Sequence, residues 1–298
     1  MITPTTEGLV IVDKPAGWTS HDVVGKVRKL ARTRRVGHAG TLDPMATGVL
    51  VLGIGRATKL LGHLALAGKV YDATIRLGAS TLTDDAEGDI TAEKDTSGVT
   101  DESVRAAVTS LTGQIQQIPS SVSAIKKDGV RSYVRVRSGE QVELVARPVT
   151  VYRFDVLAIR REGPYVDVDA TVECSSGTYV RALARDIGAA LGVGGHLMAL
   201  RRTRVGPYGL DRAHTVEQLA AEIPVISLAD AAAAAFPRVD VDERTAAQVA
   251  HGVPLPPTGH GPGRPVAVFG PDGQLLSLVE DRGARAKHLA VFADPSGS

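Results

Sequence analysis

Short β-prone runs that end in glycine or proline constrain the fold of this 298-residue chain more than any other feature. Residues 8–15 form an apolar run closed by a Pro-Ala-Gly turn, and residues 69–78 alternate apolar with polar side chains. Residues 142–159 and 165–174 are both β-rich, which indicates consecutive antiparallel strands. Helices are expected at 21–31, capped by Ser20, at 104–111 and at 178–191. Strands and helices therefore mix along the chain, which predicts an α+β fold.

A run of alanines at 231–235, followed by Phe236 and Pro237, marks a change in composition. Beyond it, the β-prone runs 266–269 and 275–279 are separated by glycine and proline. We therefore expect two domains, residues 1–236 and a small β-rich module at 237–298.

The cellular setting is constrained by what the sequence lacks. No apolar run reaches the roughly 18 residues that span a membrane. The first residues do not have the layout of a signal peptide, and a cytoplasmic location is expected. The single cysteine, Cys174, excludes an internal disulfide and a cysteine-rich metal site, and we interpret it as a small buried residue at a strand end rather than as a nucleophile.

The net charge of +1 hides an uneven distribution. Residues 84–102 carry eight acids and one lysine and are expected to form a surface loop, whereas 26–35, 126–137 and 201–204 are strongly basic. Between Asp22 and Asp43 the chain has no acid but six basic residues. A carboxylate beside a cationic strip suggests chemistry on a polyanion.

Asp43 lies among Gly37, Gly40 and Gly48, which allow a backbone to turn sharply or to approach a ligand closely. Its carboxylate suits a nucleophile, a general base or a metal ligand, but no second acid or histidine lies nearby at ligand spacing. A glycosidase with a distant second carboxylate stays open. Locally, Asp43 followed by Pro44 is also a good N-cap and first-turn pair for a helix.

A second cluster runs from Cys174 through a Ser-Ser-Gly turn into the helix expected at 178–191. Ser175 or Ser176 could cap this helix, whose free N–H groups could also hold an anion. Tyr179 and Arg181 lie in or near its first turn.

Six groups of residues resemble the motifs of the TruB family of pseudouridine synthases, in order, over about residues 8–215. They are Asp13, Lys14, Pro15 and Gly17; residues 37–44 with 48–50; Lys69 and Tyr71; Ser123, Ala124, Lys126, Gly129, Tyr133, Arg137 and Gly139; Ser175, Gly177, Thr178, Tyr179, Arg181, Leu183 and Asp186; and Leu200, Arg201, Arg202, Thr203 and Gly206. The resemblance implies a mixed, largely antiparallel central sheet flanked by helices, with a PUA-like RNA-binding C-terminal domain.

The resemblance also implies an isomerase that converts the T-loop uridine of tRNA, at standard position 55, to pseudouridine without a metal or redox cofactor. Asp43 matches the catalytic aspartate, whose alternative roles are attack on ribose C1′, attack on base C6, or proton abstraction at C2′ that yields a glycal. Arg181 would pair with it and keep it ionised. The other site residues implied are Tyr71, which stacks on the uracil and assists proton removal; His38, which fills the vacated place in the loop; and Tyr179, Leu200 and Lys14 at the substrate.

The RNA backbone would be held by basic residues, namely Arg34, Arg35, Lys126, Lys127, Arg137, Arg201 and Arg202. Some of them lie in an RNA-gripping insertion at about 119–140, where Pro119-Ser120-Ser121-Val122 replaces the two prolines and tyrosine of many relatives. The expected partner is the tRNA T-arm stem-loop, bound by a monomer without guide RNA or membrane. A non-catalytic tRNA-binding or folding module and a nucleoside hydrolase or glycosidase that uses Asp43 remain as alternatives.

Overall fold

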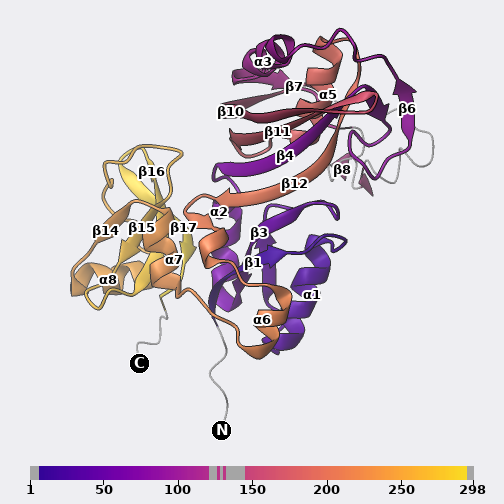
Figure 1. The fold of residues 1–298 in the computed structure, drawn as a ribbon. Helices are drawn as coiled ribbons and strands as arrows, with labels where there is room; N and C mark the ends of the chain where they lie inside the picture. Colours follow the sequence, from indigo (N-terminus) through magenta and orange to yellow (C-terminus); the bar gives the residue numbers. More distant parts are fainter. Residues whose placement is uncertain (1–6, 121–125, 128–129, 132–144, 294–298) are drawn as a thin grey trace. The chain divides into compact units, whose positions relative to one another are not determined.

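A computed structural model describes residues 7–120, 126–127, 130–131 and 145–293. The chain forms two compact units. Unit 1 comprises residues 1–44, 48–65 and 205–298, and unit 2 comprises 45–47 and 66–204. Each unit therefore contains segments that are far apart in the sequence (Figure 1).

The N-terminal part of unit 1 contributes three antiparallel strands. Strand β3 (Thr47–Ile54) pairs with β1 (Gly8–Lys14) and with β2 (Val36–Ala39), and every residue of β3 after Thr47 is buried. Helix α1 (Ser20–Leu30) buries its valines, as its apolar spacing predicts. Its N-cap is Thr19 rather than the expected Ser20, and Thr19 forms a capping box with Asp22.

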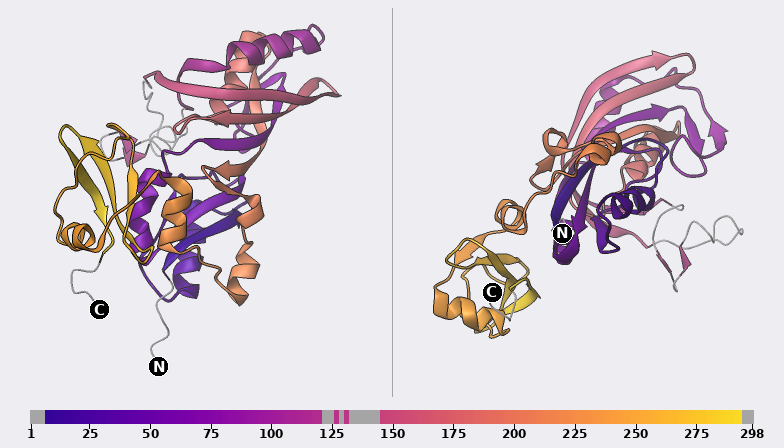
Figure 2. Two further views of the ribbon diagram at one scale, coloured as in Figure 1. Left: turned by 90° about the vertical axis from the view of Figure 1, so that its left-hand side faces the viewer. Right: turned by 90° about the horizontal axis from the view of Figure 1, so that it is seen from below.

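The rest of unit 1 consists of short elements and a four-stranded sheet. The short elements are the 3-10 helix η1 (Gly55–Leu60), α2 (Leu61–Leu64), β13 (Tyr208–Gly209), η2 (Leu210–Arg212), α6 (Val216–Ala221) and α7 (Leu228–Ala235). The sheet has the order β14-β15-β16-β17, and α8 (Glu243–Ala250) packs beside it, as Figure 2 shows in orange and yellow. Its strands are Arg238–Asp240, Val266–Phe269, Leu275–Arg282 and Arg285–Val291.

The two expected runs beyond residue 237 are thus confirmed as strands. One apolar core contains residues from both parts of unit 1, for example Leu9, Val49, Phe269 and Leu278. The expected domain boundary between residues 236 and 237, and the PUA-like nature of the C-terminal module, stay predictions.

Unit 2 is built on a larger sheet in which five strands follow the order β12-β4-β11-β10-β7. They are β12 (Gly195–Val205, whose last residue belongs to unit 1), β4 (Lys69–Leu77), β11 (Tyr165–Cys174), β10 (Arg147–Glu162) and β7 (Gly113–Gln117). The expected hairpin of β10 and β11 is confirmed, because Glu162 pairs with Tyr165 and Val151 with Cys174. The prediction of a mixed, largely antiparallel sheet with helices is therefore correct.

Two helices and two short strand pairs complete unit 2. Helices α3 (Asp101–Ser110) and α5 (Val180–Ala190) lie next to each other beside the sheet (Figure 1). The strand pairs are β5 (Ala79–Thr81) with β6 (Ile90–Glu93) and β8 (Lys126–Lys127) with β9 (Val130–Arg131). At Gly188 of α5 a Cβ atom would lie 2.2 Å from the backbone of Gly194 and Gly195, so only glycine permits this close approach.

Candidate functional site

Asp43 lies in the loop between β2 and β3, where its side chain is partly exposed. Glycines at both ends of this loop have a positive φ, 82° at Gly40 and 97° at Gly48, a conformation that other residues rarely adopt. No helix begins at Asp43, because the chain enters the buried strand β3 at Thr47. The interpretation of Asp43 and Pro44 as a helix cap is therefore wrong.

The residues on both sides of Asp43 are fixed by hydrogen bonds to the preceding segment of the chain. The buried hydroxyl of Ser20 accepts from the Leu42 N–H at 2.9 Å and donates to the Leu42 carbonyl at 3.1 Å. On the other side, the Pro44 carbonyl accepts from the Gly17 N–H at 2.8 Å and from Lys14 Nζ at 3.2 Å. We call this arrangement of Lys14, Gly17 and Ser20 the loop clamp, and it holds the backbone of Asp43 in one position.

Lys14 is fully buried at the end of β1, and its ammonium group also donates to the carbonyls of Pro15 at 2.9 Å and Trp18 at 2.6 Å. A buried charge needs such polar partners to offset the loss of water. Three bonds to loop carbonyls give Lys14 a structural role in the loop clamp. Its expected contact with the substrate stays a prediction.

The other expected site residues of unit 1 lie on or just before β2. His38 is half-buried on β2 and pairs in register with Leu52 of β3. Arg34 and Arg35 are exposed directly before the strand, as a residue that binds phosphate requires. Arg28 of α1 instead donates to the Val36 carbonyl at 2.9 Å and so attaches the helix to β2.

In unit 2, Tyr71 is 7% exposed on β4, in register with Val172 of β11. Two residues earlier on the same strand, Lys69 is also buried and donates to the Ala67 carbonyl at 2.9 Å. Burial, and then the nearby positive charge of Arg202, lower the pKa of Lys69 to about 8. Strand β4 therefore carries, besides Tyr71, a lysine whose charged form is destabilised by burial.

Strand β12 carries three of the expected residues. Leu200 and Arg201 are half-buried, and Arg201 donates to the Thr47 hydroxyl at 3.3 Å. Arg202 is only 1% exposed. Contacts of these residues with substrate or RNA stay predictions.

Arg181 lies in the first turn of α5, and its side chain is 7% exposed. Its guanidinium donates to Asp85 Oδ2 at 3.2 Å and to the Thr83 carbonyl at 3.1 Å. Asp85, 2% exposed, also accepts from the Thr83 hydroxyl and from the Glu87 N–H at 3.1 Å. A buried ion pair with further hydrogen bonds fixes the direction of the arginine. The expected pairing of Arg181 with Asp43 stays a prediction.

One turn later on α5, Arg185 binds a second aspartate of the same segment. It donates to Asp84 at 3.3 Å, to Asp186 at 2.9 Å and to the Ile118 carbonyl at 2.8 Å. Burial, and to a smaller extent the charge of Asp84, raise the pKa of Asp186, although Arg185 opposes this. Two neighbouring aspartates thus bind two arginines that are four residues apart on one helix.

The start of the acidic segment therefore differs from the expected surface loop. Asp85 is buried and Asp84 largely buried, whereas the later acids Glu87, Asp89 and Glu93 are exposed. Asp85 is the functional candidate that the sequence did not reveal. The sequence offers only the weak signal that the aspartate pair comes first in the acidic run, three residues after the end of β5 at Thr81.

The turn before α5 is attached to the sheet rather than to the helix that follows. Ser175 accepts from the Thr150 N–H at 2.9 Å through its hydroxyl, and its own N–H donates to the Thr150 carbonyl at 2.8 Å. The N-cap of α5 is Tyr179, without a side-chain hydrogen bond to the helix. The expected capping by Ser175 or Ser176 is therefore wrong.

Cys174 is fully buried at the end of β11, which confirms its interpretation as a buried strand residue. Burial raises the pKa of its thiol to about 11, so the thiol is neutral at physiological pH. A cysteine in this state is a poor nucleophile.

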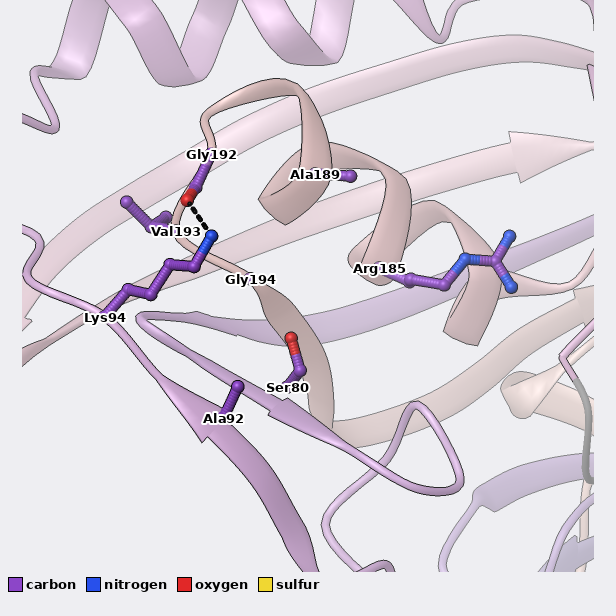
Figure 3. Close-up of a pocket in the computed structure, with 8 residues that line it drawn as sticks. All are labelled: Ser80, Ala92, Lys94, Arg185, Ala189, Gly192, Val193 and Gly194. Atoms are coloured by element: carbon purple, nitrogen blue, oxygen red, sulfur yellow. Dashed lines mark hydrogen bonds between the residues drawn. The ribbon is translucent and has the colours of Figure 1, made fainter.

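A shallow pocket of about 270 Å³ lies where the segment after β6 meets the end of α5 (Figure 3). Lys94 crosses it and donates to the Gly192 carbonyl at 2.9 Å, whereas the Arg185 guanidinium points away from Lys94. The polar groups do not converge on the space between them, so the pocket is a structural junction. Among the described residues, no cluster of three or more histidines, cysteines or acids could hold a metal ion.

Some expected residues lie at or beyond the limits of the structure. Arg137, and with it Ser123, Ala124, Gly129, Tyr133 and Gly139, lies outside the described residues. Lys126 and Lys127 form β8, whose backbone pairs with β9. No helix in the described parts of the chain is long and apolar enough to cross a membrane.

Comparison with known sequences and structures assigns the chain to a family. The model of the "TruB family pseudouridylate synthase (N terminal domain)" matches residues 28–180. Two further models match 181–231, "tRNA pseudouridylate synthase B C-terminal domain", and 236–293, "tRNA Pseudouridine synthase II, C terminal".

Relatives match over nearly the whole length. The tRNA pseudouridine synthase B of Streptomyces griseus is 64% identical over 98% of this chain and 99% of its own. That of Thermobifida fusca is 58% identical over 96% of this chain and 99% of its own.

Solved structures of related proteins have a similar fold. The structure of a Cbf5-Nop10-Gar1 complex superimposes with a TM-score of 0.74 at 28% identity, over 97% of this chain and 86% of that chain. The structure of an H/ACA RNP bound to a substrate RNA containing 2′-deoxyuridine gives 0.72 at 26% identity, over 99% and 92%. With its fold, its motifs and a family model that covers residues 28–180, the chain belongs to the TruB family of pseudouridine synthases.

Proposed function

We propose that the protein converts the T-loop uridine of tRNA, at standard position 55, to pseudouridine, with Asp43 as the catalytic nucleophile or base. One observation carries the proposal. In a member of this family, the loop clamp fixes the backbone on both sides of Asp43 while the carboxylate stays partly exposed. A reacting group gains rate from being held in position before the substrate arrives. The relatives named tRNA pseudouridine synthase B support tRNA as the substrate.

The reaction breaks the bond between ribose C1′ and uracil N1, turns the base, and joins C5 of the base to C1′. The proton on C5 must then leave. The proposed roles of Asp43 are attack on C1′, attack on C6, or removal of the C2′ proton. Arg181 is proposed to pair with Asp43 and to orient its carboxylate, because charge-assisted hydrogen bonds from a guanidinium fix the direction of a carboxyl group.

The target base must leave its stack to reach Asp43, which costs a few kcal/mol. Stacking on an aromatic ring returns about 1–3 kcal/mol per base, so one tyrosine offsets much of this cost. Tyr71 is the proposed stacking ring and is proposed to assist removal of the C5 proton. Tyr179 and Leu200 are proposed to line the uracil site, and His38 is proposed to fill the place of the flipped base.

The RNA backbone is proposed to be held by arginines and lysines, above all by the exposed Arg34 and Arg35. We propose that a monomer binds the T-arm without guide RNA, metal or redox cofactor. Binding of this kind weakens steeply with salt, because each neutralised phosphate releases counterions.

A direct assay tests the function. The pure protein is incubated with an unmodified tRNA transcript, without added RNA and in EDTA, and pseudouridine is mapped along the product. We expect one modified uridine, in the T-loop. Tight tRNA binding without product would favour the folding module, and release of free uracil would favour a hydrolase; either result would overturn the proposed function.

A further inference from the structure

The side chain of Gln117 forms two hydrogen bonds with the backbone of Tyr179, and no sequence motif drew attention to it. The Tyr179 N–H donates to Gln117 Oε1 at 2.8 Å, and Gln117 Nε2 donates to the Tyr179 carbonyl at 3.1 Å. The two partners require opposite atoms, so only one orientation of the amide satisfies both. Gln117 is the last residue of β7 and is 2% exposed.

This contact lies where the start of α5 is determined. Tyr179 is the N-cap residue, with φ −100° and ψ 107°, and it has no side-chain hydrogen bond to the helix. Its carbonyl also accepts from the Leu183 N–H at 3.2 Å, the first hydrogen bond of the helix. A cap residue needs outside partners when its own side chain supplies none. Gln117, 62 residues earlier in the chain, is that partner.

From these contacts we infer that Gln117 is a positioning residue for Tyr179. It fixes the two peptide groups that flank the Cα atom of Tyr179 and therefore the direction in which the tyrosine ring leaves the backbone. Ser175 attaches the other end of the same turn to Thr150 of β10, so the turn is held at both ends by the sheet. The inference rests on the proposed function, in which Tyr179 lines the uracil site.

Arg181, two residues further on, has its own partners in Asp85 and Thr83. When the Gln117 contacts are lost, Asp85 and Thr83 still hold the side chain of Arg181 in place. The loss therefore affects Tyr179 first. A displacement of about 1 Å at a reacting group can reduce a rate about a hundredfold. The effect is expected in turnover and not in tRNA affinity, which phosphate contacts dominate.

The test compares Gln117→Met with Gln116→Met. Methionine keeps the length of glutamine but can neither donate to nor accept from the backbone in this way. Gln116 is the neighbouring, exposed residue of β7 and provides the matched control. We expect Gln117→Met to lower kcat on a tRNA transcript at least about tenfold and to keep Kd for tRNA within about threefold. Gln116→Met is expected to keep the kcat and the Kd for tRNA of the wild type.

A double-mutant cycle separates positioning from a general loss of stability. If Gln117 acts through Tyr179, then Gln117→Met lowers kcat less than about twofold in a Tyr179→Leu background. Two results would overturn the inference. One is an unchanged kcat in folded Gln117→Met, and the other is a double variant whose loss of kcat equals the product of the losses in the two single variants.

If Gln117→Met does not fold, Gln117→Glu takes its place, because it keeps the size and the acceptor but puts an oxygen against the Tyr179 carbonyl. Failure of both variants to fold would identify Gln117 as a folding residue and also overturn the inference. Wild-type turnover on the same transcript is measured first. If the wild type has no turnover, the proposed function and the inference both fail. If the wild type turns over normally and Gln117→Met does so equally well, only the inference fails.

Discussion

The hydroxyl group of Ser20 bonds both the N–H and the carbonyl of Leu42, 22 residues later in the chain. This one buried hydroxyl satisfies both backbone polar groups of Leu42, the residue before Asp43. Lys14 and Gly17 donate hydrogen bonds to the Pro44 carbonyl on the other side of Asp43. The position of Asp43 is therefore fixed by contacts with residues 14–20 and not by the loop alone.

Replacement of Ser20 by alanine should loosen this loop. Ser20→Ala leaves two buried backbone groups of Leu42 without the hydroxyl, and we expect the free energy of unfolding to fall by about 1–3 kcal/mol and kcat to fall about tenfold. Thermal denaturation and single-turnover kinetics measure the two effects. Ser110→Ala, which removes a hydroxyl from the surface of α3, is the control. Equal turnover in both variants would mean that the loop clamp does not position Asp43.

Removal of the Asp43 charge should abolish turnover and leave RNA binding. Asp43→Asn keeps the shape of the side chain but cannot act as a nucleophile or base at neutral pH. We expect no pseudouridine above background and a Kd for tRNA within about tenfold of wild type. Asp211→Asn, an exposed acid of the same unit, controls for the change in net charge. Activity in Asp43→Asn would exclude Asp43 as the catalytic group.

The sequence predicted strands β4, β10 and β11 of unit 2, because a β-rich or alternating run is a local signal, but it did not indicate β7 or β12. It also indicated Asp43 correctly as a residue in a glycine-rich loop, but it left helix capping open. Asp43 with Pro44 is a good start for a helix, yet the buried strand β3 begins three residues after Pro44 and determines the backbone there. Tertiary burial outweighed the local capping preference.

Asp85 shows a second limit of the sequence. A run of eight acids indicates a solvated loop, and the later acids are indeed exposed, although Glu93 lies on β6 and Asp101 and Glu102 lie on α3. The partner that permits burial of Asp85 is Arg181, 96 residues later. Such a pair depends on which segments the sheet brings together, which no local pattern contains. Ser20 is similar, since its hydroxyl serves Leu42 and leaves the cap of α1 to Thr19.

Loss of the Asp85 charge should affect both stability and turnover. Asp85→Asn removes the charge of Asp85 from its buried ion pair with Arg181, and removing one partner of such a pair typically costs about 3–5 kcal/mol. We expect a Tm lower by several degrees and a kcat at least about tenfold lower. Asp89→Asn, an exposed acid of the same segment, should match wild type in both. A wild-type Tm for Asp85→Asn would show that Arg181 does not depend on this pair.

Lys94 should matter for stability alone. Its ammonium group donates to the Gly192 carbonyl directly after α5, where a positive charge favours the helix C-terminus (Figure 3). Lys94→Met should lower the free energy of unfolding by about 0.3–1 kcal/mol, measured by urea denaturation, with kcat unchanged. A large loss of turnover would instead indicate that the pocket beside Lys94 takes part in function.

Lys69 should make stability depend on alkaline pH. Burial lowers its pKa from 10.5 to about 8, so below pH 8 both the folded and the unfolded chain carry the charge, and the burial penalty is fully present. Between pH 8 and 10.5 the folded state releases the proton first, so the stability of wild type relative to Lys69→Met should rise, by roughly 2–3 kcal/mol from pH 7 to 10. Comparing the two variants cancels the titration of Tyr208, whose raised pKa acts in the opposite direction. Denaturation at several pH values measures the difference. A difference that does not change with pH would mean that Lys69 is not charge-destabilised in the fold.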